Sequence, residues 1–332
     1  MPPKAMGETV TSLSALLAPF CPDIERVESL LYDTLDQVEE PLGPSLRRFF
    51  AGGKRLRPAL VILVGRLFGP LHPSSYKLAA AIEMLHAATL IHDDILDAAT
   101  VRRGQAALHT TWTTNAAVLA GDCLLARAMA LSAEIAGVGK PGVMVRLADA
   151  LCTVCAGEIR QTLVSRKDYS REAYYQRIEG KTASLCAVTA ETAGILSGAD
   201  VSQVSALRRF GHKLGIAYQI VDDVLDLAGQ EEQLGKPPGN DLCCGLVTLP
   251  VLYYLEGTAD GTPVDTVLQG QRDGPHVRAA VEAIRASGAV EASLCEAQDH
   301  ASQAQNALNL FPDTLARQTL HALAEYIVSR GH

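Results

Sequence analysis

Two short acidic clusters carry the strongest chemical signal in the sequence. They are HDDILD at residues 92–97 and DDVLD at residues 222–226. If each lies on a helix, its first and last aspartates project from the same face one turn apart, and like charges at that spacing destabilise a helix. A bound cation would offset this repulsion between the carboxylates. A set of carboxylates suits a hard ion such as Mg²⁺, which also binds phosphate oxygens.

The surroundings of the two clusters favour metal binding over a solvated helix face, which is the usual interpretation of a lone DDxxD. Both clusters lie in apolar stretches, at 87–91 and 215–221, where carboxylates are costly without partners. Asp94 and Asp223 lie about 100° around the helix from the first aspartates, so they can act only as supporting or bridging ligands of the metal. Two such clusters predict facing helices that share one metal cluster.

Basic residues next to glycine form the second signal. GGKRLRP at 52–58 places three cations at the entrance of a predicted helix, RRG at 102–104 follows the first acidic cluster, and Lys181 and Lys236 each follow a glycine. Arg binds phosphate oxygens through paired hydrogen bonds and Lys binds them as a point charge. A basic pair alone is usually solvated surface. Together with the aspartates, these residues predict a site for two polyanions, one held through metal and the other by cations alone.

Helical periodicity fills the rest of the chain and predicts the elements that position these residues. Apolar residues recur at three- and four-residue steps from 74 to 97, which predicts a long helix carrying the first cluster. Clean alternation typical of strands is absent, and clusters of Gly and Pro separate the helices. The sequence therefore predicts an all-α fold with a single domain over 1–332. The expected helices span 24–38, 57–68, 74–97, 112–136, 142–165, 170–197, 202–228, 247–256, 276–287, 289–308 and 313–330.

Composition excludes several classes of protein. The chain has 332 residues, of which 48% are hydrophobic and 20% charged, a composition typical of globular proteins and not of disordered ones. The net charge of −8 argues against general nucleic-acid binding. No apolar run is long enough to span a bilayer, and the N-terminus does not resemble a signal peptide. Eight cysteines without a secretion signal predict reduced thiols and a cytoplasmic location.

The motifs together resemble those of the trans-isoprenyl diphosphate synthases (polyprenyl synthetases), and their context resembles the long-chain type. The matching part runs from about residue 46 to residue 255 in family order, and helices over 276–330 are compatible with it. The motifs are GGKRLRP (52–58), HDDILD (92–97), RRG (102–104), AVLAGDCLLARA (117–128), GKTASL (180–185), YQIVDDVLD (218–226) and GKPPGNDL (235–242). The resemblance implies a helical bundle of the isoprenoid-synthase type around a central cavity.

The resemblance also implies a reaction and a role for each motif residue. A prenyltransferase would condense isopentenyl diphosphate with an allylic diphosphate in a trans elongation, with about three Mg²⁺ ions per active site. The implied metal ligands are Asp93, Asp97 and Asp222, supported by Asp94, Asp223 and Asp226. The allylic diphosphate would contact Arg102, Lys181, Thr182, Gln219 and Lys236, and isopentenyl diphosphate would contact Lys54, Arg57, His86 and Arg103. A homodimer is expected, with weak membrane association as a route for product release.

Small residues before the first cluster bear on product length. Ala88 and Thr89 lie five and four residues before Asp93, about 6–7 Å along the helix, where a growing prenyl tail would pass. An aromatic ring at one of them would stop a C15 tail, and none is present. The sequence therefore predicts products of C20 or longer, with Leu85 and Met84 as candidate partial floors of the tunnel.

Two alternative functions stay open. Many family members have Lys where this chain has Leu246, which favours a non-catalytic or weakly active partner subunit of a heteromeric synthase. All six aspartates argue against such a subunit. A terpene cyclase would share the helical fold and one acidic motif, but the second cluster and GGKRLRP at 52–58 argue against it.

Overall fold

The structure, a computed structural model, describes residues 12–102, 104–163, 169–229, 238–258 and 261–330, and these are mainly helical. The helices of nine or more residues are α2 (Cys21–Asp36), α3 (Leu42–Phe50), α4 (Leu56–Arg66), α5 (Ser74–Leu96), α7 (Thr114–Gly137), α8 (Pro141–Leu163), α10 (Ser184–Leu196), α11 (Val201–Ala228), α14 (Leu249–Gly257), α16 (Gly274–Ala286), α17 (Ala289–Ala307) and α18 (Leu315–Ser329). The shorter ones are α1 (Leu13–Leu17), α6 (Leu108–Thr111), α9 (Arg171–Ile178), α13 (Asn240–Cys243) and α15 (Pro263–Leu268). The described residues also form two 3₁₀ turns, η1 (Ala18–Phe20) and η3 (Leu308–Leu310), and a π-helical turn, η2 (Glu179–Ala183).

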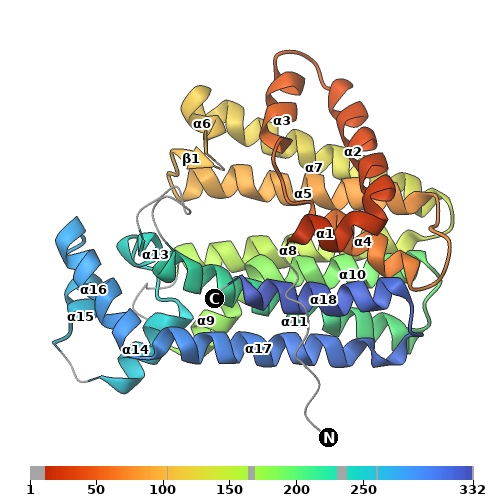
Figure 1. The fold of residues 1–332 in the computed structure, drawn as a ribbon. Helices are drawn as coiled ribbons and strands as arrows, with labels where there is room; N and C mark the ends of the chain where they lie inside the picture. The colour runs from red at the N-terminus through yellow and green to blue at the C-terminus, as the bar shows by residue number, and fades with distance from the viewer. Residues whose placement is uncertain (1–11, 103, 164–168, 230–237, 259–260, 331–332) are drawn as a thin grey trace, which may run out of the picture.

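The long helices form a layered bundle (Figure 1). α5 packs along α7 on one side of the bundle, and α11 packs along α17 on the other. α10 lies in the interior, where it contacts α4, α8 and α11. α14, α15 and α16 form a projection at the end of the bundle where α5 and α11 also end (Figure 1).

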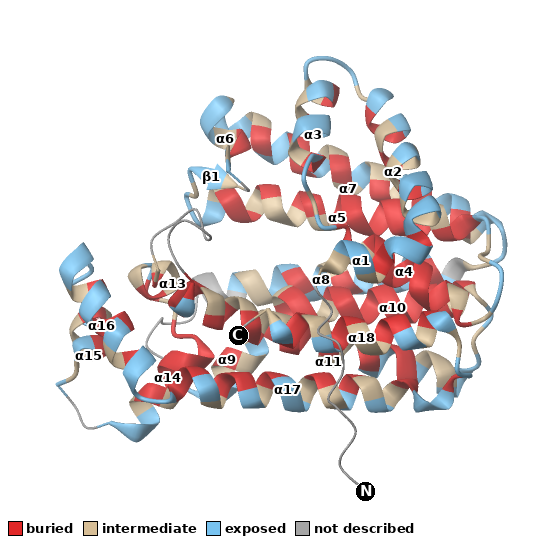
Figure 2. Cartoon of the chain, viewed as in Figure 1, coloured by how far each residue is buried: buried red, intermediate tan, exposed pale blue. Residues whose placement is uncertain are grey.

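Burial follows from this arrangement (Figure 2). Every residue of α4 from Pro58 to Gly65 is buried, and so are most residues of α10. A helix that is apolar on all faces must be covered on all sides, and α4 is covered by α2, α5, α10 and α18. The buried apolar residues form one cluster that reaches from Leu17 to Val328.

The two helices that carry the aspartate clusters have clear local reasons for their bounds. α5 begins directly after Pro73 and ends at Asp97, whose backbone N–H makes the last i to i−4 bond of the helix. α11 begins with a capping box, in which the Asp200 side chain accepts from the Gln203 backbone and the Gln203 side chain accepts from Asp200. Each aspartate cluster therefore lies in the last turns of a long, well-packed helix.

The predicted helix over 170–197 is helical without a break from Arg171 to Leu196, but it is not a regular α-helix over its whole length. The structure divides it into α9, the π-turn η2 and α10. η2 crosses α8 closely at Gly180 and Gly157. A Cβ added at Gly180 would lie only 3.4 Å from the Gly157 Cα. π-Turns within helices are frequent at functional sites, and this one carries Lys181 and Thr182.

Several elements of the described part were absent from the sequence prediction, among them α3, α15 and a short hairpin. A two-stranded hairpin, β1 (Val101–Arg102) and β2 (Gln105–Ala106), follows α5, with Arg102 paired to Gln105 in antiparallel register. The prediction that no apolar run is long enough to span a bilayer is wrong for one helix of the described ranges: by length and composition α7 could cross a membrane, with 39% of its most apolar window buried. Since α7 packs against α5 and α8, length and composition alone are weak grounds for placing it in a membrane.

Candidate active site

The first aspartate cluster lies at the end of α5. Asp93 and Asp94 are buried in its last turn, and Asp97 is the exposed residue that caps the helix. The Asp97 N–H donates to the Asp93 carbonyl at 2.8 Å, so these residues stand one turn apart, as the sequence predicts.

Arg102 binds the second aspartate of this cluster. The hairpin after α5 turns the chain back, and Arg102 Nε donates to Asp94 Oδ1 at 2.8 Å while its Nη2 contacts the same oxygen. The other oxygen, Asp94 Oδ2, is buried and accepts no hydrogen bond from any described residue. A buried carboxylate oxygen is costly in that state, and a cation would satisfy it.

Lys181 lies between two carboxylates at the same end of the bundle. Its Nζ is 3.0 Å from Asp93 Oδ2 and 3.2 Å from Glu158 Oε1. Burial opposes the charge of Lys181, but the two carboxylates outweigh it and the pKa of Lys181 is raised. Burial also raises the pKa of Asp93, against the opposing charge of Lys181. Glu158 was not predicted from the sequence, because it lies on α8 outside any motif.

Cations surround the first aspartate of the second cluster. Arg330 Nη2 is 3.3 Å from Asp222 Oδ1, and the Arg330 guanidinium stacks 4.4 Å from the centre of the Tyr218 ring. Burial raises the pKa of Asp222, although the positive charges of Arg330, Lys54 and Arg57 oppose that shift. Arg330 was missed, since nothing in the sequence of α18 marks it as a site residue.

The other two aspartates of the second cluster accept hydrogen bonds from the protein. Asp223 Oδ2 accepts from Tyr174 at 2.8 Å and its Oδ1 accepts from Gln219 at 2.9 Å. Burial, together with the negative charge of Asp241, raises the pKa of Asp223 to about 7. Asp226 Oδ2 accepts from the backbone N–H of Asp241 at 3.1 Å, which ties α13 to the end of α11.

The three cations of the GGKRLRP segment divide into two groups. Lys54 is exposed and Arg57 is half-buried, with a buried Nε that donates to no described residue, an arrangement that suits an anion. Arg55 turns inward: it has a φ of 49°, and its guanidinium donates to Glu28, to Glu83 and to the Phe50 carbonyl. Arg55 is therefore a structural residue that anchors the loop to α2 and α5.

The aspartates suit Mg²⁺ shared with a phosphate better than a metal held by protein alone. In the described part of the chain, no group of three or more acidic, His or Cys side chains is close enough to hold a metal ion. Mg²⁺ usually keeps several waters and binds one or two carboxylates together with substrate phosphates. The unpartnered Asp94 Oδ2 and the carboxylate donors at the ends of α5 and α11 fit that mode of binding.

The remaining expected site residues are placed as follows. Thr182 donates to the Gln219 Oε1 at 2.7 Å, which joins the π-turn to α11. His86 is half-buried on α5, two turns before Asp93, and its carbonyl accepts from Thr89 Oγ1 at 2.8 Å. On the same helix Ala88, Leu85 and Met84 are fully buried. Lys236 and Arg103 lie outside the described residues.

Comparison with known proteins gives consistent matches. The sequence model of the polyprenyl synthetase family matches residues 39–284. The chain is 38% identical over 312 residues to nonaprenyl diphosphate synthase of Mycobacterium tuberculosis, covering 92% of each protein. It is 37% identical over 323 residues to heptaprenyl diphosphate synthase component 2 of Geobacillus stearothermophilus, covering 96% of this chain and 99% of that protein. Among solved structures, it resembles a polyprenyl synthase from Caulobacter crescentus complexed with calcium and isoprenyl diphosphate, with a TM-score of 0.89, 35% identity and coverage of 98% of this chain and 100% of that one.

Proposed function

The chain belongs to the polyprenyl synthetase family, and from that premise we propose that it is a Mg²⁺-dependent prenyltransferase that adds isopentenyl diphosphate to an allylic diphosphate. The observation that carries the proposal is the set of charges at the ends of α5 and α11. Buried aspartates on α5 are paired with Lys181 and Arg102, and the half-buried Asp222 on α11 is paired with Arg330; all three partners are cations of the kind that bind diphosphate.

The chemistry follows from where these charges lie. The C–O bond of the allylic diphosphate breaks, and negative charge develops on the departing group. Lys181 and Arg102, beside the first cluster, stabilise that charge in a site with little water. Bound Mg²⁺ would neutralise the same charge and orient the diphosphate. The alkene of isopentenyl diphosphate forms the new C–C bond, and the proton then lost passes to the released diphosphate.

The second substrate is proposed to bind beside the second cluster. Lys54 and Arg57 lie close enough to Asp222 to oppose the rise in its pKa. The buried Arg57 Nε offers a donor to an anion. Isopentenyl diphosphate held there through cations would present its alkene to the allylic cation, with His86 on α5 as a further contact.

We propose a long-chain product of C20 or longer. Ala88 is fully buried and has no bulk to stop a tail, while Leu85 and Met84 lie one turn deeper on α5. The similarity to a nonaprenyl diphosphate synthase supports the same conclusion. The continuous apolar core supports a single domain, and eight free thiols support action in the cytoplasm.

A homodimer is proposed to form through α7 and α8. These adjacent helices expose large apolar side chains, among them Leu119 at 66% and Val145 at 58% of their full accessible area. Large exposed apolar side chains on two adjacent helices suit a protein interface. The similarity to a heptaprenyl diphosphate synthase component 2 favours a second candidate, in which this face binds a different subunit of a heteromeric synthase.

One assay separates these functions. The purified chain is incubated with labelled isopentenyl diphosphate, an allylic diphosphate and Mg²⁺, and dephosphorylated products are sized by chromatography. Incorporation into products of C20 or longer is expected, together with its loss on addition of a chelator. An inactive chain that elutes as a dimer would favour the subunit of a heteromer, and a cyclic product made without isopentenyl diphosphate would favour a terpene cyclase.

A further inference from the structure

Four side chains form one hydrogen-bonded relay beside the second aspartate cluster. Tyr174 of α9 donates to Asp223 Oδ2 at 2.8 Å, and the Gln219 amide donates to Asp223 Oδ1 at 2.9 Å. Thr182 of η2 donates to Gln219 Oε1 at 2.7 Å. The relay therefore joins α9 and α11 to the π-turn, where Lys181 precedes Thr182 and pairs with Asp93.

The relay fixes which way the Gln219 amide points. A carboxylate can only accept, so Asp223 requires the NH₂ group of Gln219 on its side. The amide oxygen then faces Thr182, whose hydroxyl donates to it. Asp223 is 3% exposed, and each of its oxygens already accepts a hydrogen bond from the protein. Asp94 differs, since its buried Oδ2 accepts from no described residue.

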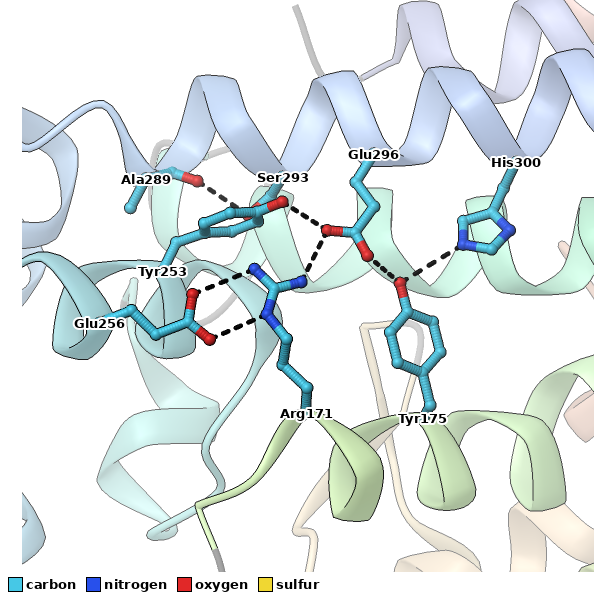
Figure 3. Close-up of polar contacts among 8 residues, drawn as sticks. All are labelled: Arg171, Tyr175, Tyr253, Glu256, Ala289, Ser293, Glu296 and His300. Carbon is cyan, nitrogen blue, oxygen red and sulfur yellow. Dashed lines mark hydrogen bonds and ion pairs between the residues drawn. The ribbon is translucent and has the colours of Figure 1, made fainter.

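α9 is also clamped to α14 and α17 (Figure 3). Arg171 Nη1 lies 3.0 Å from Glu296 Oε2, and Arg171 Nε lies 2.8 Å from Glu256 Oε1. Glu296 also accepts from Tyr175 and, at 2.5 Å, from Tyr253. Tyr175 follows Tyr174 directly, so this clamp holds α9 in the orientation that presents Tyr174 to Asp223.

We propose that Tyr174 is a positioning residue for the prenyl transfer, acting through Asp223 on Gln219, and that Asp223 anchors this relay instead of binding metal. This inference rests on the proposed function, which supplies the prenyl-transfer reaction. It also means that the metal ligands are found among the other aspartates of the two clusters and do not include Asp223. A relay that orients one amide affects how the bound substrates react more than how tightly they bind.

The first test compares two neighbouring hydroxyl deletions on α9. Tyr174→Phe is expected to lower kcat about ten-fold, the effect of losing one hydrogen bond to a charged group. The KM for isopentenyl diphosphate and the Mg²⁺ concentration for half-maximal rate should change less than about two-fold. The matched control, Tyr175→Phe, loses the Tyr175 bonds of the clamp but keeps those of Arg171 to Glu256 and Glu296, so it should lower Tm while kcat changes less than about two-fold. If Tyr174→Phe behaved like this control, its role would be structural and the proposal would fail.

A double-mutant cycle tests whether Tyr174 acts through Gln219. In a Gln219→Leu background the amide is gone, so adding Tyr174→Phe should cause little further loss of kcat. Additive losses would overturn the relay, because they would mean that the two residues act independently.

The second test does not depend on turnover. Calorimetry measures the binding of Mg²⁺ with inorganic pyrophosphate to folded variants. Asp222→Asn is expected to weaken binding at least about ten-fold, while Asp223→Asn should change it less than about two-fold. Equal weakening would make Asp223 a metal ligand and overturn the proposal, and so would an Asp223 oxygen found on Mg²⁺ in a crystal structure of that complex. Wild-type protein that binds Mg²⁺ and pyrophosphate but fails to elongate prenyl diphosphates would refute the proposed function, and the Asp223 comparison would still decide whether that residue binds metal.

Discussion

Arg55→Met should destabilise the protein strongly, although Arg55 belongs to a motif whose other cations are expected to bind substrate. The Arg55 side chain is only 6% exposed and lies 2.9 Å from Glu28 and 3.3 Å from Glu83. It also donates to the Phe50 carbonyl at 2.7 Å. These bonds hold a backbone turn with a φ of 49° at Arg55, a conformation that a non-glycine residue rarely adopts without support.

The size of the destabilisation follows from Glu83, the buried carboxylate that Arg55→Met leaves without its partner. The Glu83 side chain is 7% exposed, and removing one member of a buried ion pair costs about 3–5 kcal/mol because the other charge stays buried. The Glu28 side chain is 38% exposed, so the loss of its ion pair with Arg55 adds little to the destabilisation. The free energy of unfolding from urea denaturation should therefore fall by about 3–5 kcal/mol. Arg48→Met, at an exposed Arg on α3, is the matched control and should change it by no more than about 0.5 kcal/mol.

A second variant identifies the cause. Arg55→Met combined with Glu83→Met removes both charges and should recover much of the lost stability, since apolar residues often replace buried ion pairs without loss. In both variants kcat/KM for isopentenyl diphosphate should stay roughly ten- to a hundred-fold low, because the loop that presents Lys54 and Arg57 is no longer pinned. A loss as small as that of the Arg48 control, or a double variant no more stable than Arg55→Met, would refute this explanation.

Three further predictions concern the site itself. Asp93→Ala or Asp222→Ala should lower turnover by about a thousand-fold or more with helix content by circular dichroism unchanged, and near-normal turnover in either would contradict their role at the metal. Lys54→Ala and Arg57→Ala should each raise the KM for isopentenyl diphosphate about ten- to a hundred-fold, and a shift in the KM of the allylic substrate instead would mean that the two diphosphate sites are assigned the wrong way round. Ala88→Phe should shorten the products seen by chromatography, whereas an unchanged length distribution from a folded, active variant would mean that Ala88 does not line the tunnel.

Local periodicity explains why the helices could be predicted. α5 over Ser74–Leu96 and α11 over Val201–Ala228 agree closely with the predicted 74–97 and 202–228, because their apolar spacing and their caps are sequence-local. The helix predicted over 170–197 is continuous from Arg171 to Leu196, but its π-turn was not predicted, for the opposite reason. The π-turn at η2 accompanies a close crossing with Gly157 of α8, and no local pattern encodes that contact.

The direction of a side chain is a tertiary property. Lys54, Arg55 and Arg57 are indistinguishable as a run of cations, yet Arg55 turns inward because two other helices offer it carboxylates, the buried Glu83 and the half-buried Glu28. The first aspartates of the two clusters, in contrast, were identified by type and spacing alone.

The sequence by itself determined which residues carry charge at helical spacing, that they lie on helices, and the family to which their joint pattern belongs. Only the tertiary structure decided what each charge meets: Arg330 at Asp222, 108 residues away, and Tyr174 at Asp223, 49 residues away. The physical reason is the range of the interactions. Helix spacing is set by backbone hydrogen bonds four residues apart, whereas the partner of a buried carboxylate is set by how α9, α11 and α18 pack around one apolar core.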